Sequence, residues 1–137
     1  MFSFYKMKLD EKFFILLNGI ISEFEYSYKL ISEFFCDEKY GIGASGIIII
    51  EKSKVADIKM KMLDSDGIEN RDFNTGIKCL VRYLYEHSDY KKINLETIDG
   101  IKGVIFDLNE ENNLFLKIND NYIQGNAIEL FEGRLNI

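Results

Sequence analysis

The chain has 137 residues, of which 47% are apolar, and a formal net charge of −6 at pH 7, which suits one domain with a sizeable core. The acidic balance argues against a nucleic-acid partner, because contact with the phosphate backbone needs a basic surface. No apolar run approaches the roughly 20 residues of a membrane span, no signal peptide is visible and the two cysteines suit a reducing compartment, so we expect a cytoplasmic protein that binds no membrane.

In chain order, the sequence predicts many strands and two helices. Runs rich in β-branched, aromatic or alternating apolar residues predict strands at 2–7, 13–18, 46–52, 56–63, 93–98, 103–108, 113–118 and near 122–131. Apolar residues at helical spacing predict helices over 23–38 and 75–88, and Ser22 and Glu25 have the spacing of a capping box at the first helix. There is no proline and no Ser/Gly-rich linker, so residues 1–137 are predicted to form a single α+β domain.

The segment YGIGASGIIII (40–50) contains Gly41, Gly43 and Gly46 in a G-x-G-x-x-G arrangement. A dinucleotide-binding site needs a strand before these glycines and a helix after them. Here a predicted helix comes before them, and four isoleucines, which are typical of a strand, come after them. The glycines therefore predict a helix-to-strand turn and not a nucleotide site.

The helix predicted over 75–88 is apolar around most of its circumference. Its apolar residues include Ile77, Leu80, Val81, Tyr83 and Leu84, and they leave only a narrow polar stripe. Such a helix is expected to be enclosed by sheet.

Four segments, in order, resemble motifs in the N-terminal half of diaminopimelate epimerase. Residues 36–50, CDEKYGIGASGIIII, are similar to the family's C-D-R-x-F-G-I-G-A-D-G and the apolar strand after it. Residues 62–84, MLDSDGIENRDFNTGIKCLVRYL, resemble F-N-x-D-G-S-E-x-x-x-C-G-N-G-x-R-C and the helix after it. Residues 5–19, YKMKLDEKFFILLNG, and 95–102, LETIDGIK, resemble K-M-H-G-L-G-N-D-F and V-x-T-x-A-G-x-x. Together the four segments span nearly the whole chain.

The resemblance implies two similar lobes, each a curved, mostly antiparallel sheet wrapped around a central helix. The family's active site lies between the lobes, where one thiolate removes the α-proton of an amino acid and a thiol from the other lobe delivers a proton to the opposite face. This chemistry uses no metal and no pyridoxal cofactor. By this resemblance residues 1–137 form one lobe, with 75–88 as the central helix and 23–38 as one outer helix.

The resemblance also identifies substitutions at the expected site. Phe73 stands where the family has the catalytic cysteine of this lobe, and a phenyl group has no proton to transfer. Lys12 and Asp64 stand where the family has two substrate-binding asparagines, and a carboxylate at position 64 would repel the carboxylate of an amino acid. Asn74 and Thr75 replace the Gly and Asn that follow the cysteine. With these positions altered together, the family's reaction is not expected in this chain.

The start of the second predicted helix has two interpretations. Residues 74–76, Asn-Thr-Gly, lead into the helix, and free N–H groups at a helix start attract anions. In the family this end holds a substrate carboxylate, so Lys12, Asp64, Asn74, Thr75 and Gly76 can form a vestigial site for a carboxylate or an amino acid. In the other interpretation, Asn74 or Thr75 simply caps the helix.

The remaining candidates predict no metal or cofactor site. Cys79 matches a second cysteine of the family's motif inside the helix and is expected to be a buried, inert thiol. Cys36 lies late in the first predicted helix, where no neighbouring base would activate it. A disulfide between them stays open as an alternative. His87 is the single histidine and lies near a helix end, where it can contact the last carbonyls.

Three functions follow as hypotheses. The first is a non-catalytic, single-lobe relative of diaminopimelate epimerase that acts as a homodimer or docks on a second-lobe-like protein. The second is half of a cofactor-independent amino-acid epimerase or racemase that a second lobe completes. The third is a binding module for a carboxylate or an amino acid at residues 74–76.

Overall fold

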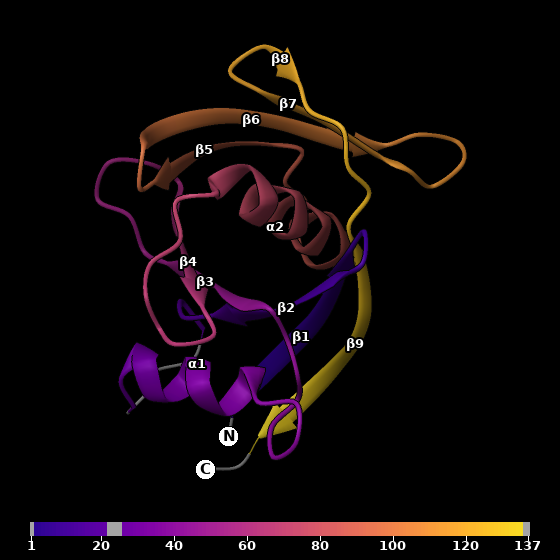
Figure 1. Cartoon of the computed structure of the whole chain (residues 1–137). Helices are drawn as coiled ribbons and strands as arrows, with labels where there is room; N and C mark the ends of the chain where they lie inside the picture. Colours follow the sequence, from indigo (N-terminus) through magenta and orange to yellow (C-terminus); the bar gives the residue numbers. More distant parts are fainter. Residues whose placement is uncertain (1, 22–25, 136–137) are drawn as a thin grey trace.

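The computed structural model describes residues 2–21 and 26–135, and these residues form one curved sheet with two helices. In chain order the elements are β1 (Phe2–Leu9), β2 (Lys12–Asn18), α1 (Tyr28–Cys36), β3 (Gly46–Glu51), β4 (Ile58–Asp64), α2 (Phe73–His87), β5 (Lys92–Thr97), β6 (Gly100–Leu108), β7 (Leu114–Ile118), β8 (Asn121–Tyr122) and β9 (Ile128–Leu135). Figure 1 shows the sheet curving around α2, with α1 on the outside. The predicted α+β architecture, with one central and one outer helix, is confirmed.

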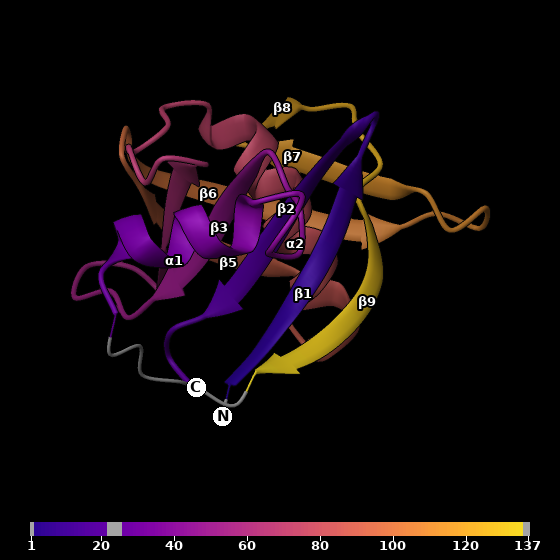
Figure 2. The ribbon, with the colours of Figure 1, turned by 60° about the horizontal axis from the view of Figure 1, so that its bottom comes forward.

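The strand order in the sheet is β8-β7-β6-β5-β4-β3-β2-β1-β9. All neighbours pair antiparallel except β2–β3 and β4–β5, which are parallel. The first and last strands of the chain lie side by side, as Figure 2 shows, because β9 pairs with β1 across its whole length. The two ends of the chain are therefore joined by pairs of residues that are at least 120 positions apart in sequence.

The core has two layers, one on each face of the sheet. The concave face and α2 enclose the larger cluster, which includes Ile48, Ile50 and Leu80. The convex face of β1–β4 packs against α1 in a second cluster, which includes Ile47 and Ile49. The four isoleucines of β3 thus alternate between the two layers, and all are at most 1% exposed. Strand β3 is therefore covered on both of its faces.

The glycine-rich turn joins α1 to β3, as predicted. A Cβ on Gly41 would lie 1.8 Å from the carbonyl oxygen of Phe34, so only glycine allows this approach to the helix end. Gly43 has φ of +84°, which a residue with a side chain rarely adopts. The helix itself ends earlier than predicted, at Cys36.

Several element boundaries differ from the prediction. Helix α1 begins at Tyr28, where the Ser27 side chain accepts a hydrogen bond from the N–H of Leu30; the proposed capping box of Ser22 and Glu25 lies outside the described residues. Helix α2 begins two residues earlier than predicted. The strand expected near 122–131 is instead the short β8 and the separate β9. Within the described residues, neither helix is long and apolar enough to cross a membrane.

Candidate functional site

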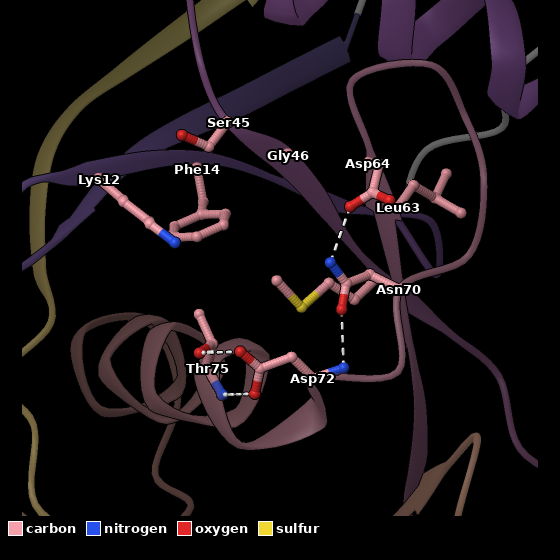
Figure 3. Close-up of a pocket in the computed structure, with 10 residues that line it drawn as sticks. Lys12, Phe14, Ser45, Gly46, Leu63, Asp64, Asn70, Asp72 and Thr75 are labelled. Carbon is pink, nitrogen blue, oxygen red and sulfur yellow. Dashed lines mark hydrogen bonds between the residues drawn. The ribbon is translucent and has the colours of Figure 1, made fainter.

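A pocket of about 140 Å³ lies at the N-terminal end of α2 (Figure 3). Its lining comes from the starts of β2 and β3, the end of β4, the loop after β4 and the first turn of α2. The lining residues are Lys12, Phe14, Ser45, Gly46, Met62, Leu63, Asp64, Asn70, Asp72 and Thr75. The register of the sheet brings the strand ends together, because Gly46 pairs with Phe14 in the parallel β2 and with Asp64 in the antiparallel β4.

The side chain of Asn70 links the carboxylate of Asp64 to the backbone of Asp72. Its amide nitrogen donates to Asp64 Oδ1 at 2.7 Å, and its Oδ1 accepts the backbone N–H of Asp72 at 2.7 Å. The backbone N–H of Asn70 donates to the carbonyl of Met62 at 2.7 Å, which fixes the loop to the end of β4. The side chains of Asp64 and Asn70 and the backbone of Asp72 are therefore held in one hydrogen-bonded chain, as Figure 3 shows.

Asp72 is the N-cap of α2. Its Oδ1 accepts the backbone N–H of Thr75 at 3.4 Å, and its Oδ2 accepts the Thr75 hydroxyl at 2.7 Å. The suggestion that Asn74 or Thr75 caps the helix is therefore wrong, since both residues lie inside its first turn. A negative charge at this end also interacts favourably with the helix dipole.

The structure brings three of the five predicted site residues to one pocket, which three further polar residues also line. Lys12, Asp64 and Thr75 line the pocket, whereas Asn74 and Gly76 are outside its lining. A Cβ on Gly76 would lie 3.0 Å from the sulfur of Met60, so this glycine serves the packing of α2 on β4. The missed polar residues are Ser45, Asn70 and Asp72. The three-residue spacing of Asp72 and Thr75 was a usable sequence signal for the cap.

Phe73 is a half-buried packing residue at the start of α2. Its ring packs against the inner cluster, and the Lys102 ammonium lies 4.9 Å from the ring centroid. Lys102 in turn pairs with Asp99 at 3.2 Å. The ring is therefore held between apolar side chains and a cation, an arrangement that is favourable for an aromatic side chain.

Both thiols are buried away from the pocket. Cys79 lies in the inner cluster and Cys36 in the outer cluster, on opposite faces of the sheet, and both are free. Their separation removes the alternative of a disulfide between them. Burial raises the pKa of the Cys36 thiol to about 11 and that of Cys79 to about 12. At neutral pH neither is a thiolate, so neither can act as a nucleophile or base there.

His87 takes part in a different contact from the one expected. Its Nε2 lies 2.7 Å from Glu129 Oε1 on β9, and its ring stacks on Tyr83. The last turn of α2 is capped instead by Ser88, whose backbone N–H and hydroxyl both donate to the carbonyl of Leu84. Among the described residues, no group of three His, Cys, Asp or Glu side chains is arranged to hold a metal ion.

The charged groups of the pocket are two carboxylates and one ammonium, and all three can make hydrogen bonds. The carboxylates belong to Asp64 and Asp72, and the ammonium to Lys12. Asp72 is exposed and Asp64 half-buried, so both keep water contact. The pocket therefore combines two carboxylate acceptors with one ammonium donor, and its lining has a net negative charge.

Comparison with known proteins gives a consistent result, although no protein-family model matches the chain. The diaminopimelate epimerase of Clostridium perfringens is 32% identical over 120 residues, which are 86% of this chain and 43% of that protein. The epimerase of Alkaliphilus metalliredigens is 34% identical over 101 residues, 72% of this chain and 36% of that protein. The match with the epimerase of Heliobacterium modesticaldum is 46% over 68 residues, 48% of this chain and 24% of that protein.

Solved structures show the same fold at low sequence identity. A phenazine biosynthesis protein of the PhzF family from Bacillus anthracis superposes with a TM-score of 0.63 at 20% identity, covering 85% of this chain and 40% of that one. A methylitaconate-delta-isomerase superposes with a TM-score of 0.53 at 13% identity, covering 81% and 35%. This chain is thus a homologue of the diaminopimelate epimerases that spans less than half of their length and has the fold of one epimerase-like lobe.

Proposed function

We propose that this lobe does not catalyse the epimerase reaction and acts by binding a partner, either a second copy of itself or a protein with a second epimerase-like lobe. The observation that carries the proposal is the environment of position 73. By the resemblance this is the position of a catalytic thiol, and it is occupied by a phenyl ring packed between the inner cluster and Lys102.

The chemistry supports the absence of turnover. Racemisation by two bases needs a proton acceptor on one side of the substrate and a proton donor on the other, and each positioned group contributes about 10²–10⁴-fold. Phe73 supplies neither, and the raised pKa values of the buried Cys36 and Cys79 keep both native thiols protonated at neutral pH. The lobe therefore lacks its own half of the reaction.

Two exposed apolar regions support a binding role. Ile101, Ile105, Phe115 and Tyr122 are each at least 41% exposed on β6–β8, beyond the part of the sheet that packs against α1. The edge strand β9 exposes Leu130 and Phe131 at 42% and 45%. Apolar residues gathered in this way are typical of surfaces that meet another protein.

Light scattering coupled to size-exclusion chromatography tests the proposal. We expect a mass twice that of the 16.0 kDa chain, or a larger complex when a second-lobe protein is added. Leu130→Lys on the edge strand and Ile105→Lys on the outer face form a matched pair, because both side chains are 42% exposed. One of the two should abolish the assembly while leaving the melting temperature nearly unchanged. A monomer at high concentration that retains no partner would contradict the proposal.

A second candidate is half of an amino-acid epimerase completed by another lobe. It is favoured by coverage, because the chain matches only 43% and 36% of the length of two epimerases. In that case the catalytic thiol would come from the other lobe alone, and one-thiol chemistry would be required. The test is exchange of the α-proton of amino acids in deuterated water, measured by proton NMR with the second lobe present. If no exchange occurs, this candidate function is excluded.

A further inference from the structure

We propose that the edge of β9 joins this chain to a second copy of itself, by antiparallel pairing of the two β9 strands about a two-fold axis at Gly133. This inference rests on the proposed partner-binding function and deepens it, because it commits to one surface, one partner and one strand register. It assigns Glu132 and Arg134 as the residues that select the register.

Strand β9 is the long open edge of the sheet. The strand order ends at β8 on one side and at β9 on the other, and β8 has only two residues whereas β9 has eight. Apart from residues of β1, none of the described residues forms a hydrogen bond with the backbone of β9. Figure 2 shows β9 as the outermost strand on its side of the sheet. Such an edge presents a row of N–H and C=O groups that can pair with another strand.

The second half of β9 has little of the protection that edge strands usually carry. Natural sheets blunt their open edges with lysine, proline, bulges or charged side chains. Strand β9 contains neither lysine nor proline, and its one register shift against β1 comes before residues 131–135, which pair regularly. The charges in this segment are those of Glu132 and Arg134. They are opposite in sign, so a second copy of the same strand can neutralise both.

The side chains of this segment are sorted by chemistry between the two faces of the sheet. Glu132 lies on the inner face, where the hydroxyl of Tyr5 donates to it at 3.2 Å, and Arg134 follows two residues later on the same face. Phe131 and Leu135 lie on the outer face, where the phenyl ring makes an edge contact with an aromatic ring of β1 and the leucine packs on the outer cluster. The segment therefore has one charged face and one apolar face.

A two-fold axis at Gly133 matches all four of these side chains. Pairing this glycine with its own copy places Glu132 of each chain opposite Arg134 of the other, and Phe131 of each chain opposite Leu135 of the other. Opposite charges and apolar pairs directly across two antiparallel strands stabilise the pairing, and like charges destabilise it. An axis one residue earlier or later would place two Glu132 or two Arg134 side chains opposite each other. The charge pattern of the strand therefore selects the axis at Gly133.

The test is the dissociation constant of the dimer, measured by sedimentation equilibrium over a range of chain concentrations at physiological ionic strength. Arg134→Glu and Glu132→Arg each turn both ion pairs into like-charge pairs, so each should raise the dissociation constant at least about tenfold. The double variant that combines Glu132→Arg with Arg134→Glu restores opposite charges in the same register. Its dissociation constant should return to within about threefold of the wild-type value.

Two control variants separate this explanation from general effects of charge and of lost contacts within the chain. Arg71→Glu makes the same change in net charge as Arg134→Glu, at an exposed position in the loop before α2, and Tyr5→Phe removes the hydrogen bond to Glu132 but keeps its charge. Both should dimerise like the wild-type chain. The melting temperature of each variant shows that the chain is folded.

The inference is overturned if the wild-type chain stays monomeric, if either single charge reversal leaves the dissociation constant unchanged, if the double variant is no tighter than the single ones, or if either control weakens the dimer as much. A dimer that survives both charge reversals would leave the partner-binding function standing on another surface. A monomer that also binds no second-lobe protein would contradict both proposals.

Discussion

Replacing Phe73 with cysteine should create a thiol that is much more reactive than the two native ones. Position 73 is the first residue of α2, and its side chain is half-buried. The Lys102 ammonium lies 4.9 Å from the centre of the present ring. A helix start and a nearby ammonium both favour a thiolate, so the new thiol should have a pKa no higher than the ordinary value of about 8.5.

The magnitude follows from the native thiols. Burial raises the pKa of Cys36 to about 11 and of Cys79 to about 12, which leaves about one thiolate in 10³ and one in 10⁴ at pH 8, against about one in four for a pKa of 8.5. The more basic thiolates are intrinsically more nucleophilic, and this reduces the rate advantage of the new thiol over Cys36 by about one order of magnitude. The new thiol should therefore react at least about tenfold faster than Cys36, and restricted access to the buried sulfurs widens the gap.

The assay is reaction with Ellman's reagent at pH 8 in native buffer and again in denaturant. The native wild-type chain should show no fast phase, and native Phe73→Cys should show one fast equivalent per chain. The denatured wild-type chain should titrate its two cysteines and the variant one more. Phe73→Ser removes the same packing without adding sulfur and should stay silent. A fast equivalent in wild type or in the serine variant would refute the inertness of the native thiols, and a silent Phe73→Cys would refute the accessibility of position 73.

Two further predictions concern the fold. Gly41→Ala should lower the free energy of unfolding in urea by more than about 2 kcal/mol, because its Cβ would lie 1.8 Å from the Phe34 carbonyl oxygen. The control Gly103→Ala should change this free energy by less than about 1 kcal/mol, because the nearest non-adjacent atom would lie 3.8 Å from its Cβ. Cys79 keeps its proton to a higher pH when folded than when unfolded, so it stabilises the fold fully below pH 9 and loses this contribution as the pH rises toward 12. The wild-type unfolding free energy should fall more steeply from pH 9 to 11 than that of Cys79→Ala, by about 1.4 kcal/mol per pH unit; equal slopes would show that the thiol is not buried in solution.

Local sequence patterns predicted the centre of the fold because they coincide with its packing. The four isoleucines of β3 alternate between two fully covered layers. Each of these positions is therefore apolar, and the continuous apolar run clearly indicates a buried strand. The same holds for α2, which is enclosed by the sheet and is apolar on most sides. At such positions the demand of the tertiary structure and the local preference agree.

The last strand could not be placed because its register depends on a distant partner. The predicted strand near 122–131 spans Gly125, with φ of +153°, and Asn126, whose side chain accepts the N–H of Leu114. These residues lead across to the other end of the sheet. Strand β9 then pairs with β1, and a register shift opposite Lys6 and Met7 interrupts its alternation. The local sequence of the last strand does not contain the position of its partner strand, so its bounds could not be predicted from it.

The start of α2 was misplaced for a different reason. Asp, Asn and Thr are all good N-caps, so the run of Asp72, Asn74 and Thr75 offers several starts of nearly equal quality. The structure selects Asp72 because Asn70 accepts its backbone N–H and holds it in position. The choice is made by the loop and by the end of β4, to which the loop is tied, and so it lies outside the local propensity of the helix.

The polar residues of the pocket lie outside the core clusters, although its apolar lining residues Phe14, Met62 and Leu63 belong to them, and this explains how a lobe can keep its shape while its site changes. Lys12 is the first residue of β2 and Asp64 the last of β4, and neither belongs to the core clusters, so substitutions there leave the buried volume untouched. Phe73 differs from these polar residues, because it lies at the pocket end of α2 and packs on the inner cluster. By the resemblance, a phenyl ring at position 73 replaces the family's reacting thiol, and this ring makes apolar contacts and a cation–π interaction with Lys102. Phe73→Cys should therefore melt at a lower temperature than wild type even as its thiol becomes reactive, and a variant that gained the thiol without losing stability would show that the ring contributes nothing to the fold.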